Sequence, residues 1–233
     1  MQLFYNNKND SEFILSNDES HHIKKVLRKH EGDILNFTDG EGNLIIGKII
    51  SFKKKQAIIQ KINNLKKKKS HNYNLHIAIS PTKNMDRFEW FLEKATEIGV
   101  DEITPMICER SERKVIKIER CNRILISAMK QSLKYHLPKL HETTLFKDII
   151  NNSSLNNKYI AHLNNKSIPL KNQSAQNDTT ILIGPEGDFS ENEIQQAILK
   201  EFKLINLGKN RLRTETAGVV AVNTININSN STG

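Results

Sequence analysis

The sequence holds few of the residues that crosslink or punctuate a chain. It has 2 Cys, 5 Pro and 10 Gly among 233 residues, and 6% of its residues are aromatic. Cys108 and Cys121 are too few to staple a chain of this size, and they lack the spacing to histidine of a zinc site. We therefore predict a protein of a reducing compartment, the cytoplasm, with no structural disulfide and no metal.

Long apolar runs are also missing. No segment approaches the roughly 18 consecutive apolar residues of a membrane-spanning helix, and residues 1–10 contain no apolar stretch of signal-peptide length. The low aromatic content argues against a platform that stacks the bases of unstructured single strands. We expect neither a membrane span nor a membrane partner.

Positive charge is abundant and unevenly distributed. Lys and Arg total 35 against 26 Asp and Glu, which gives a formal net charge of +9 and a pI near 9.4. Residues 1–70 hold 14 Lys and Arg against 8 Asp and Glu, whereas the rest of the chain holds 21 against 18. This clustering favours a nucleic-acid partner that the front of the chain contacts through phosphates. For any single lysine, a solvated surface is the simpler explanation.

The front of the chain has the pattern of short strands separated by turns. Strand-like runs occupy residues 34–37, 44–50 and 57–62. A helical patch at residues 20–29 interrupts them, with Ile23, Val26 and Leu27 at helical spacing. Four consecutive lysines close this part of the chain. We predict a small β-barrel over residues 1–69.

The rest of the chain alternates strands and helices. Strands are predicted at residues 75–79, 103–107, 159–163, 180–183 and 204–207. Helices are predicted at residues 85–98, 118–133, 190–201 and 214–227, and asparagine-rich loops at 151–157 and 164–177. Such alternation predicts an α/β domain with a mostly parallel sheet and helices on both faces.

One strand-to-helix loop has the composition of a ligand site. An apolar strand leads into Gly184, Pro185, Glu186 and Gly187, and Ser190 with Glu193 can form a capping box at the next helix. Backbone N–H groups converge at such strand ends in open α/β sheets. The loop lacks the lysine of a phosphate loop and the glycine spacing of a dinucleotide site. Glu186 between two glycines makes a functional site as plausible as an ordinary tight turn.

A second strand ends in a similar way further along the chain. Leu207 and Gly208 close it, a basic loop follows, and Thr214 can cap the last helix. In that helix, Ala217 and Gly218 are small enough to allow close packing. If the two strands are neighbours, the two loops form one cleft.

Together these segments resemble the SPOUT superfamily, and within it the small-subunit (16S) ribosomal RNA uridine-N3 methyltransferases. The resemblance rests on residues 184–187, 207–208 and 212–217, taken in that order. Three more segments agree: His21-His22 with residues 26–28 and 32–33; residues 94–100 with 103–105 and 109–111; and Gln131-Ser132 with Pro138. The resemblance therefore covers nearly the whole chain.

The resemblance implies a PUA-like β-barrel, residues 1–69, before a SPOUT α/β domain, residues 70–233, whose C-terminal part forms a trefoil knot. It also implies a homodimer with the active site near the interface, and S-adenosylmethionine as cofactor. The residues that it assigns to the cofactor are Leu163, Ile183, Gly184, Gly187, Leu207, Gly208, Leu212, Arg213 and Thr214. Methyl transfer from a sulfonium needs alignment rather than a metal.

The implied reaction needs a group that removes the N3 proton of uracil or stabilises the anion left behind. We assign Glu186 to base catalysis or positioning, and Arg213 or Arg110 to charge stabilisation on the uracil oxygens. A carboxylate that only shapes its loop through backbone N–H groups remains an equal alternative for Glu186. The residues expected to contact RNA are His22, Lys24, Lys25, Arg28, Arg110 and Arg113, on a folded RNA within the small ribosomal subunit.

Two positions depart from the family pattern, and two other functions stay open. Asp188 stands where the family commonly has glycine, and Lys134 stands near an arginine position, which weakens a bidentate or stacking role there. One alternative is a non-catalytic RNA-binding or ribosome-assembly factor. The other is a SPOUT methyltransferase acting on transfer RNA or on a ribose hydroxyl. The intact loops favour an enzyme, because a pure binder needs no cofactor pocket.

Overall fold

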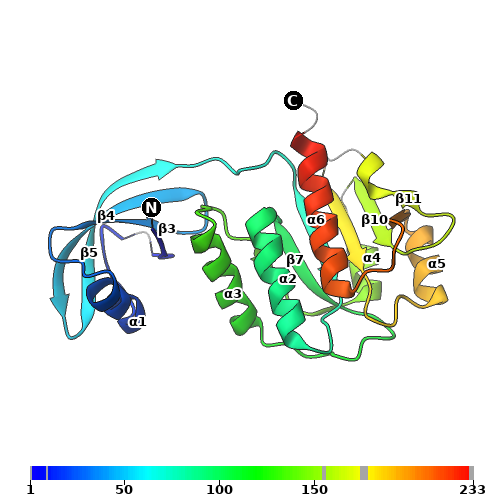
Figure 1. Ribbon diagram of the computed structural model, residues 1–233, viewed down its shortest axis with the longest axis horizontal. Helices are drawn as coiled ribbons and strands as arrows, with labels where there is room; N and C mark the ends of the chain where they lie inside the picture. The colour runs from blue at the N-terminus through cyan, green and yellow to red at the C-terminus, as the bar shows by residue number, and fades with distance from the viewer. Residues whose placement is uncertain (1, 9, 154–155, 174–177, 231–233) are drawn as a thin grey trace. The chain divides into compact units, whose positions relative to one another are not determined.

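The structure, a computed structural model, describes residues 2–8, 10–153, 156–173 and 178–230. Parts of the asparagine-rich segments, residues 154–155 and 174–177, lie outside this description. The chain forms two compact units (Figure 1). Unit 1 comprises residues 1–69 with 129–137, and unit 2 comprises residues 70–128 with 138–233.

The segment 129–137 is where this division differs from a single cut after residue 69. Within unit 1, the carbonyl oxygen of Tyr135 accepts hydrogen bonds from Gly42 N–H at 2.8 Å and from Thr38 Oγ1 at 3.2 Å. Lys130 Nζ also pairs with Glu19 at 2.9 Å. The membership of this segment in unit 1 could not be predicted from the sequence, because its contacts join residues that are far apart in the chain.

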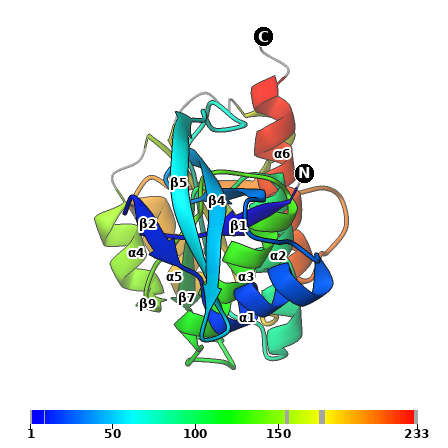
Figure 2. The same ribbon diagram turned by 90° about the vertical axis from the view of Figure 1, so that its left-hand side faces the viewer.

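A five-stranded sheet forms the frame of unit 1. Its strands are β1 (Leu3–Tyr5), β2 (Glu12–Ile14), β3 (Ile34–Thr38), β4 (Asn43–Lys53) and β5 (Gln56–Lys66), in the order β1-β3-β4-β5-β2. Figure 2 shows the long antiparallel pair β4 and β5 side by side. The turn between them places Lys54 and Lys55 at φ 47° and 69°, the left-handed pair of a type I′ hairpin. The predicted strands at residues 34–37, 44–50 and 57–62 are confirmed, and β1 and β2 are additional.

Three phenylalanine rings pack together in the core of unit 1, among aliphatic side chains. The Phe37 ring is fully buried and meets Phe13 edge-on, with their ring centroids 5.1 Å apart. Phe4 packs on the same ring from β1. Ile23 reaches this core from the helical patch. The few aromatic residues of the front of the chain are thus used for packing.

The helical patch of unit 1 differs from its prediction. It starts earlier, as α1 (Asn17–His21) capped by Ser16, and continues as a π-helix, His22–Val26. Ile23 is buried as expected, but Val26 is 61% exposed. The wider π turn changes the angle between successive side chains, so a stripe based on 3.6 residues per turn places Val26 on the wrong face.

Unit 2 is built on a parallel sheet. Its strands are β6 (Leu75–Ile79), β7 (Glu102–Ile107), β8 (Lys139–Leu140), β9 (Thr144–Leu145), β10 (Asn157–Ala161), β11 (Ile168–Pro169), β12 (Thr179–Ile183) and β13 (Lys203–Asn206). The order is β11-β13-β10-β12-β6-β7-β8, with β9 also pairing with β7. Every strand pair is parallel. The predicted α/β architecture with a parallel sheet is confirmed.

Helices cover the sheet of unit 2. They are α2 (Met85–Ile98), α3 (Ile118–Gln131), which runs on into unit 1, α4 (Phe146–Asn152), α5 (Glu191–Leu199) and α6 (Thr214–Asn230). The predicted bounds of α2 are confirmed, with Asn84 as its N-cap and Gly99 at its end. The predicted capping box of Ser190 and Glu193 is present at the start of α5. Among the described residues, no helix has the length and apolar character to cross a membrane.

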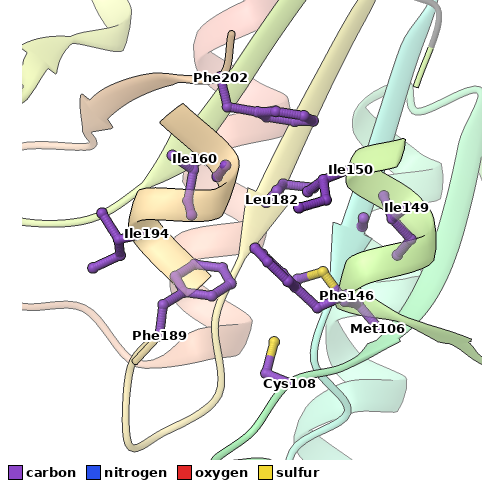
Figure 3. Packing of buried hydrophobic residues seen from close by; sticks show 12 residues of the cluster. Met106, Cys108, Phe146, Ile149, Ile150, Ile160, Leu182, Phe189, Ile194 and Phe202 are labelled. Atoms are coloured by element: carbon purple, nitrogen blue, oxygen red, sulfur yellow. The ribbon is translucent and has the colours of Figure 1, made fainter. Parts of the chain in front are cut away.

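Two helical layers bury the two faces of the sheet. Figure 3 shows Leu182 of β12 in a cluster with Phe146 of α4 and Ile194 of α5. On α6, a methyl group at Gly218 would lie 2.6 Å from the Phe91 ring of α2 and 2.9 Å from Ile79 of β6. Figure 1 shows α2 and α6 alongside one another. Only a residue without a side chain allows this close approach.

Strand β10 lies two residues earlier than its prediction. Its register runs from Asn157 opposite Thr179 to Ala161 opposite Ile183. Leu163, predicted as the last residue of the strand, therefore lies in the following loop and is 48% exposed. The polar residues at the start of the strand hide its true beginning from a reading based on apolar periodicity.

Candidate functional site

Three neighbouring strands of unit 2 end at the same edge of the sheet. Strand β10 lies between β12 and β13, and all three run parallel. The loops that follow them comprise residues 162–167, 184–190 and 207–213. Because the carboxyl ends of parallel strands share one edge, these loops converge there, as expected for a ligand site in an open α/β sheet.

Hydrogen bonds tie two of these loops together. Thr214 Oγ1 donates to the carbonyl oxygen of Gly184 at 3.0 Å, and Arg211 Nη2 donates to the carbonyl oxygen of Glu186 at 3.1 Å. The backbone at Gly208 has φ 136°, in a range that side-chain-bearing residues rarely adopt. The two motifs found in the sequence are therefore parts of one structure.

The converging loops line a half-open cavity of about 310 Å³, a size typical of small-molecule sites. From the first two strand ends, the predicted residues Leu163, Ile183 and Gly184 line it. From the third come Leu207, Gly208, Leu212, Arg213 and Thr214. Leucine and isoleucine side chains supply an apolar wall, and the loop backbones and arginines supply polar groups. Gly187, also predicted for the cofactor, is not among the lining residues.

Gly187 contacts the side chain of Arg110. Arg110 Nη1 donates to the carbonyl oxygens of Gly187 at 3.0 Å and Phe189 at 3.4 Å, and the α-carbon of Gly187 faces the Arg110 side chain. Arg110 itself is not among the lining residues. In the structure, the guanidinium of this predicted catalytic residue binds the loop backbone.

Glu186 lines the cavity, and its carboxylate is already in contact with the backbone. Its Oε1 accepts a hydrogen bond from the N–H of Lys83 at 2.9 Å. The carbonyl oxygen of Lys83 accepts from Arg113 Nη2 at 2.7 Å. Arg113, which was predicted to contact RNA, therefore forms a hydrogen bond within unit 2. This geometry matches the loop-shaping alternative for Glu186.

Sequence reasoning missed His162 as a site residue. His162 lines the cavity, and its Nδ1 lies 3.0 Å from Oδ2 of Asp188. Asp188, noted above only as a departure from a family pattern, lines the cavity too and has φ 63°. The available signal was the position of His162 directly after strand β10. Because the strand was predicted to end at residue 163, two residues too late, His162 was placed inside it.

The predicted RNA contacts of unit 1 lie on and after its helical patch. Lys24 Nζ lies 4.7 Å from the centroid of the Phe52 ring, and His22 Nε2 lies 3.1 Å from the Gln2 amide nitrogen. Lys25 and Arg28 are exposed, and Arg28 has φ 54°. In the described part of the chain, no three His, Cys, Asp or Glu side chains are grouped to hold a metal ion.

Two family models match this chain. A model described as an RNA methyltransferase domain matches residues 68–226. A second, described as an RNA methyltransferase PUA domain, matches residues 15–62. The PUA-domain match lies within unit 1. The methyltransferase-domain match covers most of unit 2 and includes the segment 129–137 that belongs to unit 1.

Individual relatives and solved structures agree with these matches. The ribosomal RNA small subunit methyltransferase E of Mesomycoplasma hyopneumoniae is 35% identical over 227 residues, 94% of this chain and 95% of the relative. A crystal structure of a probable rRNA methyltransferase from Porphyromonas gingivalis has a TM-score of 0.94 and 38% identity over the full length of both chains. A ribosomal RNA small subunit methyltransferase E from Neisseria gonorrhoeae, bound to S-adenosyl methionine, has a TM-score of 0.85 and 28% identity over 95% of each chain.

Proposed function

This chain belongs to the ribosomal RNA small subunit methyltransferase E family, and we propose that it methylates N3 of a uridine in 16S ribosomal RNA with S-adenosylmethionine. The observation that carries the proposal is the cavity of about 310 Å³ at the ends of β10, β12 and β13. It lies within the residues that match the methyltransferase domain.

The residues around the cavity fit the proposed cofactor. S-adenosylmethionine has a flat adenine ring, an aliphatic chain and charged ends, and therefore needs apolar walls, backbone partners and charged side chains. Ile183, Leu207 and Leu212 supply apolar surface, while Arg213 and Asp188 supply charges of opposite sign. The bound cofactor would supply an electrophilic methyl group on its sulfonium.

The side chains of this site divide the remaining work. Arg213 is exposed and lines the cavity, so we assign it to stabilising the charge that develops on the uracil oxygens. We assign Glu186 to positioning the loop, because its carboxylate accepts from the Lys83 N–H; removal of the N3 proton by Glu186 is the alternative role. Arg110 acts as a positioning residue, because its guanidinium binds the loop carbonyls.

The finer features of the fold belong to the same proposal. We assign unit 1 to a PUA-like RNA-binding domain in which Lys24, Lys25 and Arg28 contact phosphate. We also propose that the C-terminal part of unit 2 forms a trefoil knot. The position of β10 between β12 and β13, and the hydrogen bond of Thr214 to Gly184, support it.

We further propose a cytoplasmic homodimer that acts on RNA within the small ribosomal subunit. Sedimentation equilibrium of the purified chain tests the dimer, which predicts twice the monomer mass of 26.7 kDa. Methylation assays with intact subunits and with protein-free 16S RNA test the substrate. Faster methylation of the intact subunit is the expected result.

Nucleoside mass spectrometry tests the activity directly. Ribosomal RNA from a strain lacking this gene is expected to lose one N3-methyluridine, and expression of this chain is expected to restore it. Restoration by the wild type but not by Arg213→Ala would link the activity to the cavity. An unchanged nucleoside profile in the deletion strain would overturn the proposed function.

A non-catalytic ribosome-assembly factor with the same fold is the second candidate. The cavity at the strand ends argues against it, because RNA binding alone does not require a small-molecule pocket. Calorimetric titration with S-adenosylmethionine separates the two, since a folded chain that binds RNA but no cofactor would favour the assembly factor. A substrate other than 16S RNA would appear as methylation of transfer RNA in the methylation assays.

A further inference from the structure

Asp188 and His162 form a hydrogen-bonded pair in the wall of the cavity, and they come from different strand ends. His162 directly follows β10, and Asp188 lies in the loop after β12. The His162 Nδ1 to Asp188 Oδ2 distance is 3.0 Å. Both residues line the cavity that the proposed function assigns to S-adenosylmethionine.

The backbone around this pair is held in place on both sides. The N–H of His162 donates to the carbonyl oxygen of Ile205 at 3.0 Å, and its carbonyl oxygen accepts from Ser167 Oγ. The N–H of Asp188 donates to the carbonyl oxygen of Pro185 at 2.9 Å. The imidazole and the carboxylate are therefore presented from fixed positions.

The Asp188 carboxylate uses both of its oxygens. Oδ1 accepts from the N–H of Phe189 at 2.8 Å, and Oδ2 faces His162. An acceptor-only carboxylate requires a donor, so Nδ1 of His162 carries the proton in this contact. Asp188 also has a left-handed backbone with φ 63°, a conformation that aspartate and asparagine adopt more readily than most other residues. The pair therefore holds a negative charge at a defined place on the cavity wall.

We propose that Asp188, oriented by His162, makes this cavity selective for the positively charged methyl donor over its demethylated product. This inference rests on the proposed function. When the methyl group leaves the sulfonium, the cofactor becomes a neutral thioether, while its amino and carboxyl groups keep their charges. The methyl group is bonded to the uridine nitrogen, and the N3 proton goes to the base or to water. A carboxylate in the wall attracts the donor more strongly than the product and so favours product release.

Calorimetry with S-adenosylmethionine and S-adenosylhomocysteine tests the proposal. The informative variant is Asp188→Asn, since asparagine tolerates the left-handed backbone and keeps an acceptor for the Phe189 N–H. The Asp188 side chain is 43% exposed, so solvent screens its charge. We therefore expect its removal to weaken donor binding by about three- to tenfold and product binding by less than about twofold. Asp188→Gly, which also suits this backbone, should give the same shift.

Two variants of His162 test the positioning role. His162→Asn retains an amide donor near the place of Nδ1 and should keep the donor-to-product affinity ratio. His162→Ala removes the donor and should lower that ratio, with no further loss when combined with Asp188→Asn. Glu201→Gln is the matched control, because Glu201 is an acidic residue with φ 67° whose side chain is 89% exposed outside the cavity.

The outcomes separate this inference from the function on which it rests. If the folded wild type binds neither compound, the proposed function fails. If the wild type binds both, and the Asp188 variants weaken both equally or not at all, the charge-selection inference fails while the function stands. Thermal unfolding of each variant identifies any that lose their fold, and the remaining Asp188 variant then decides.

Discussion

Thr214 Oγ1 donates a hydrogen bond to the carbonyl oxygen of Gly184 at 3.0 Å, and this contact joins the start of α6 to the loop that follows β12. Thr214 is 4% exposed. Arg211 adds a second link through the Glu186 carbonyl. We therefore expect the shape of the cavity to depend on the docking of α6, and cofactor binding to be coupled to the packing of that helix.

Thr214→Val should weaken S-adenosylmethionine binding by about five- to tenfold, because it leaves the partly buried Gly184 carbonyl without this donor. Calorimetry measures the change in dissociation constant. Thr224→Val, in the same helix, loses only a bond to the Val220 carbonyl and should bind as the wild type does. Equal affinities for all three proteins would contradict the coupling.

Glu186→Gln should retain cofactor binding within about twofold, because the glutamine carbonyl can still accept from the Lys83 N–H. Glu186→Ala removes that acceptor and should weaken binding further. Single-turnover methylation assays then report on the proton transfer. We expect Glu186→Gln to stay within about tenfold of the wild-type rate, whereas a loss of a hundredfold or more with normal binding would identify Glu186 as the base.

Gly218→Ala should destabilise unit 2 by about 1–3 kcal/mol, because its methyl group would overlap the Phe91 ring and Ile79. Urea unfolding measures the difference. Asn223→Ala, at an exposed position of α6, is the control, and it should be neutral or slightly stabilising because alanine favours helix. A stable Gly218→Ala variant would show that α2 and α6 can move apart at little cost.

His76 should make stability fall at acidic pH. Its Nε2 lies 2.7 Å from Thr104 Oγ1, and burial lowers its pKa to about 4, with Glu102 opposing and His141 reinforcing the shift. Below about pH 6.5 the His76 imidazole binds a proton in the unfolded chain, whereas in the folded chain it binds one only near pH 4. The contribution of neutral His76 to the free energy of unfolding is therefore complete above pH 6.5. It decreases as the pH falls, by about 2 kcal/mol between pH 7 and pH 5.

Urea unfolding of the wild type and His76→Gln at pH 7 and pH 5 measures this contribution. The variant should lose less stability on acidification than the wild type. His30→Gln, at an exposed position of unit 1, should keep the wild-type dependence. The same pH dependence in all three proteins would assign acid sensitivity to other groups.

Lys25→Gln should weaken binding to 16S ribosomal RNA and make it less salt-dependent. The variant would neutralise one phosphate fewer, so its binding would release fewer counterions from the RNA. Filter binding over a series of KCl concentrations measures both effects. The slope of log affinity against log salt concentration is negative, and we expect its magnitude to fall by about one. Lys147→Gln removes an exposed charge from α4 and should leave the slope unchanged if unit 1 carries the contact.

The parts of the fold that could be predicted are those with a local signal. Helix α2 has an apolar stripe, an Asn84 cap and a terminal Gly99, and each of these belongs to the helix itself. The capping box of α5 is likewise readable within four residues. In contrast, β1 and β2 are three residues long and form through pairing with distant strands, so periodicity within them carries no information.

The candidate site divides along the same line. Its loops could be located because glycines and a helix cap mark the ends of β12 and β13. The pairing of His162 with Asp188 could not, since it requires the knowledge that β10 lies next to β12. The contact of Arg110 with the Gly187 carbonyl was hidden for the same reason. Both interactions depend on strand order, which composition and spacing do not encode.

The return of residues 129–137 to unit 1 bears on how this gene can be divided. The chain passes between the units after residues 69, 128 and 137, and Tyr135 supplies a backbone acceptor for Thr38 and Gly42. A graft that exchanges the front unit between relatives must therefore carry two separate stretches of coding sequence. A recombination at residue 69 alone would join a front unit to a foreign segment 129–137, so the two units are expected to be inherited together.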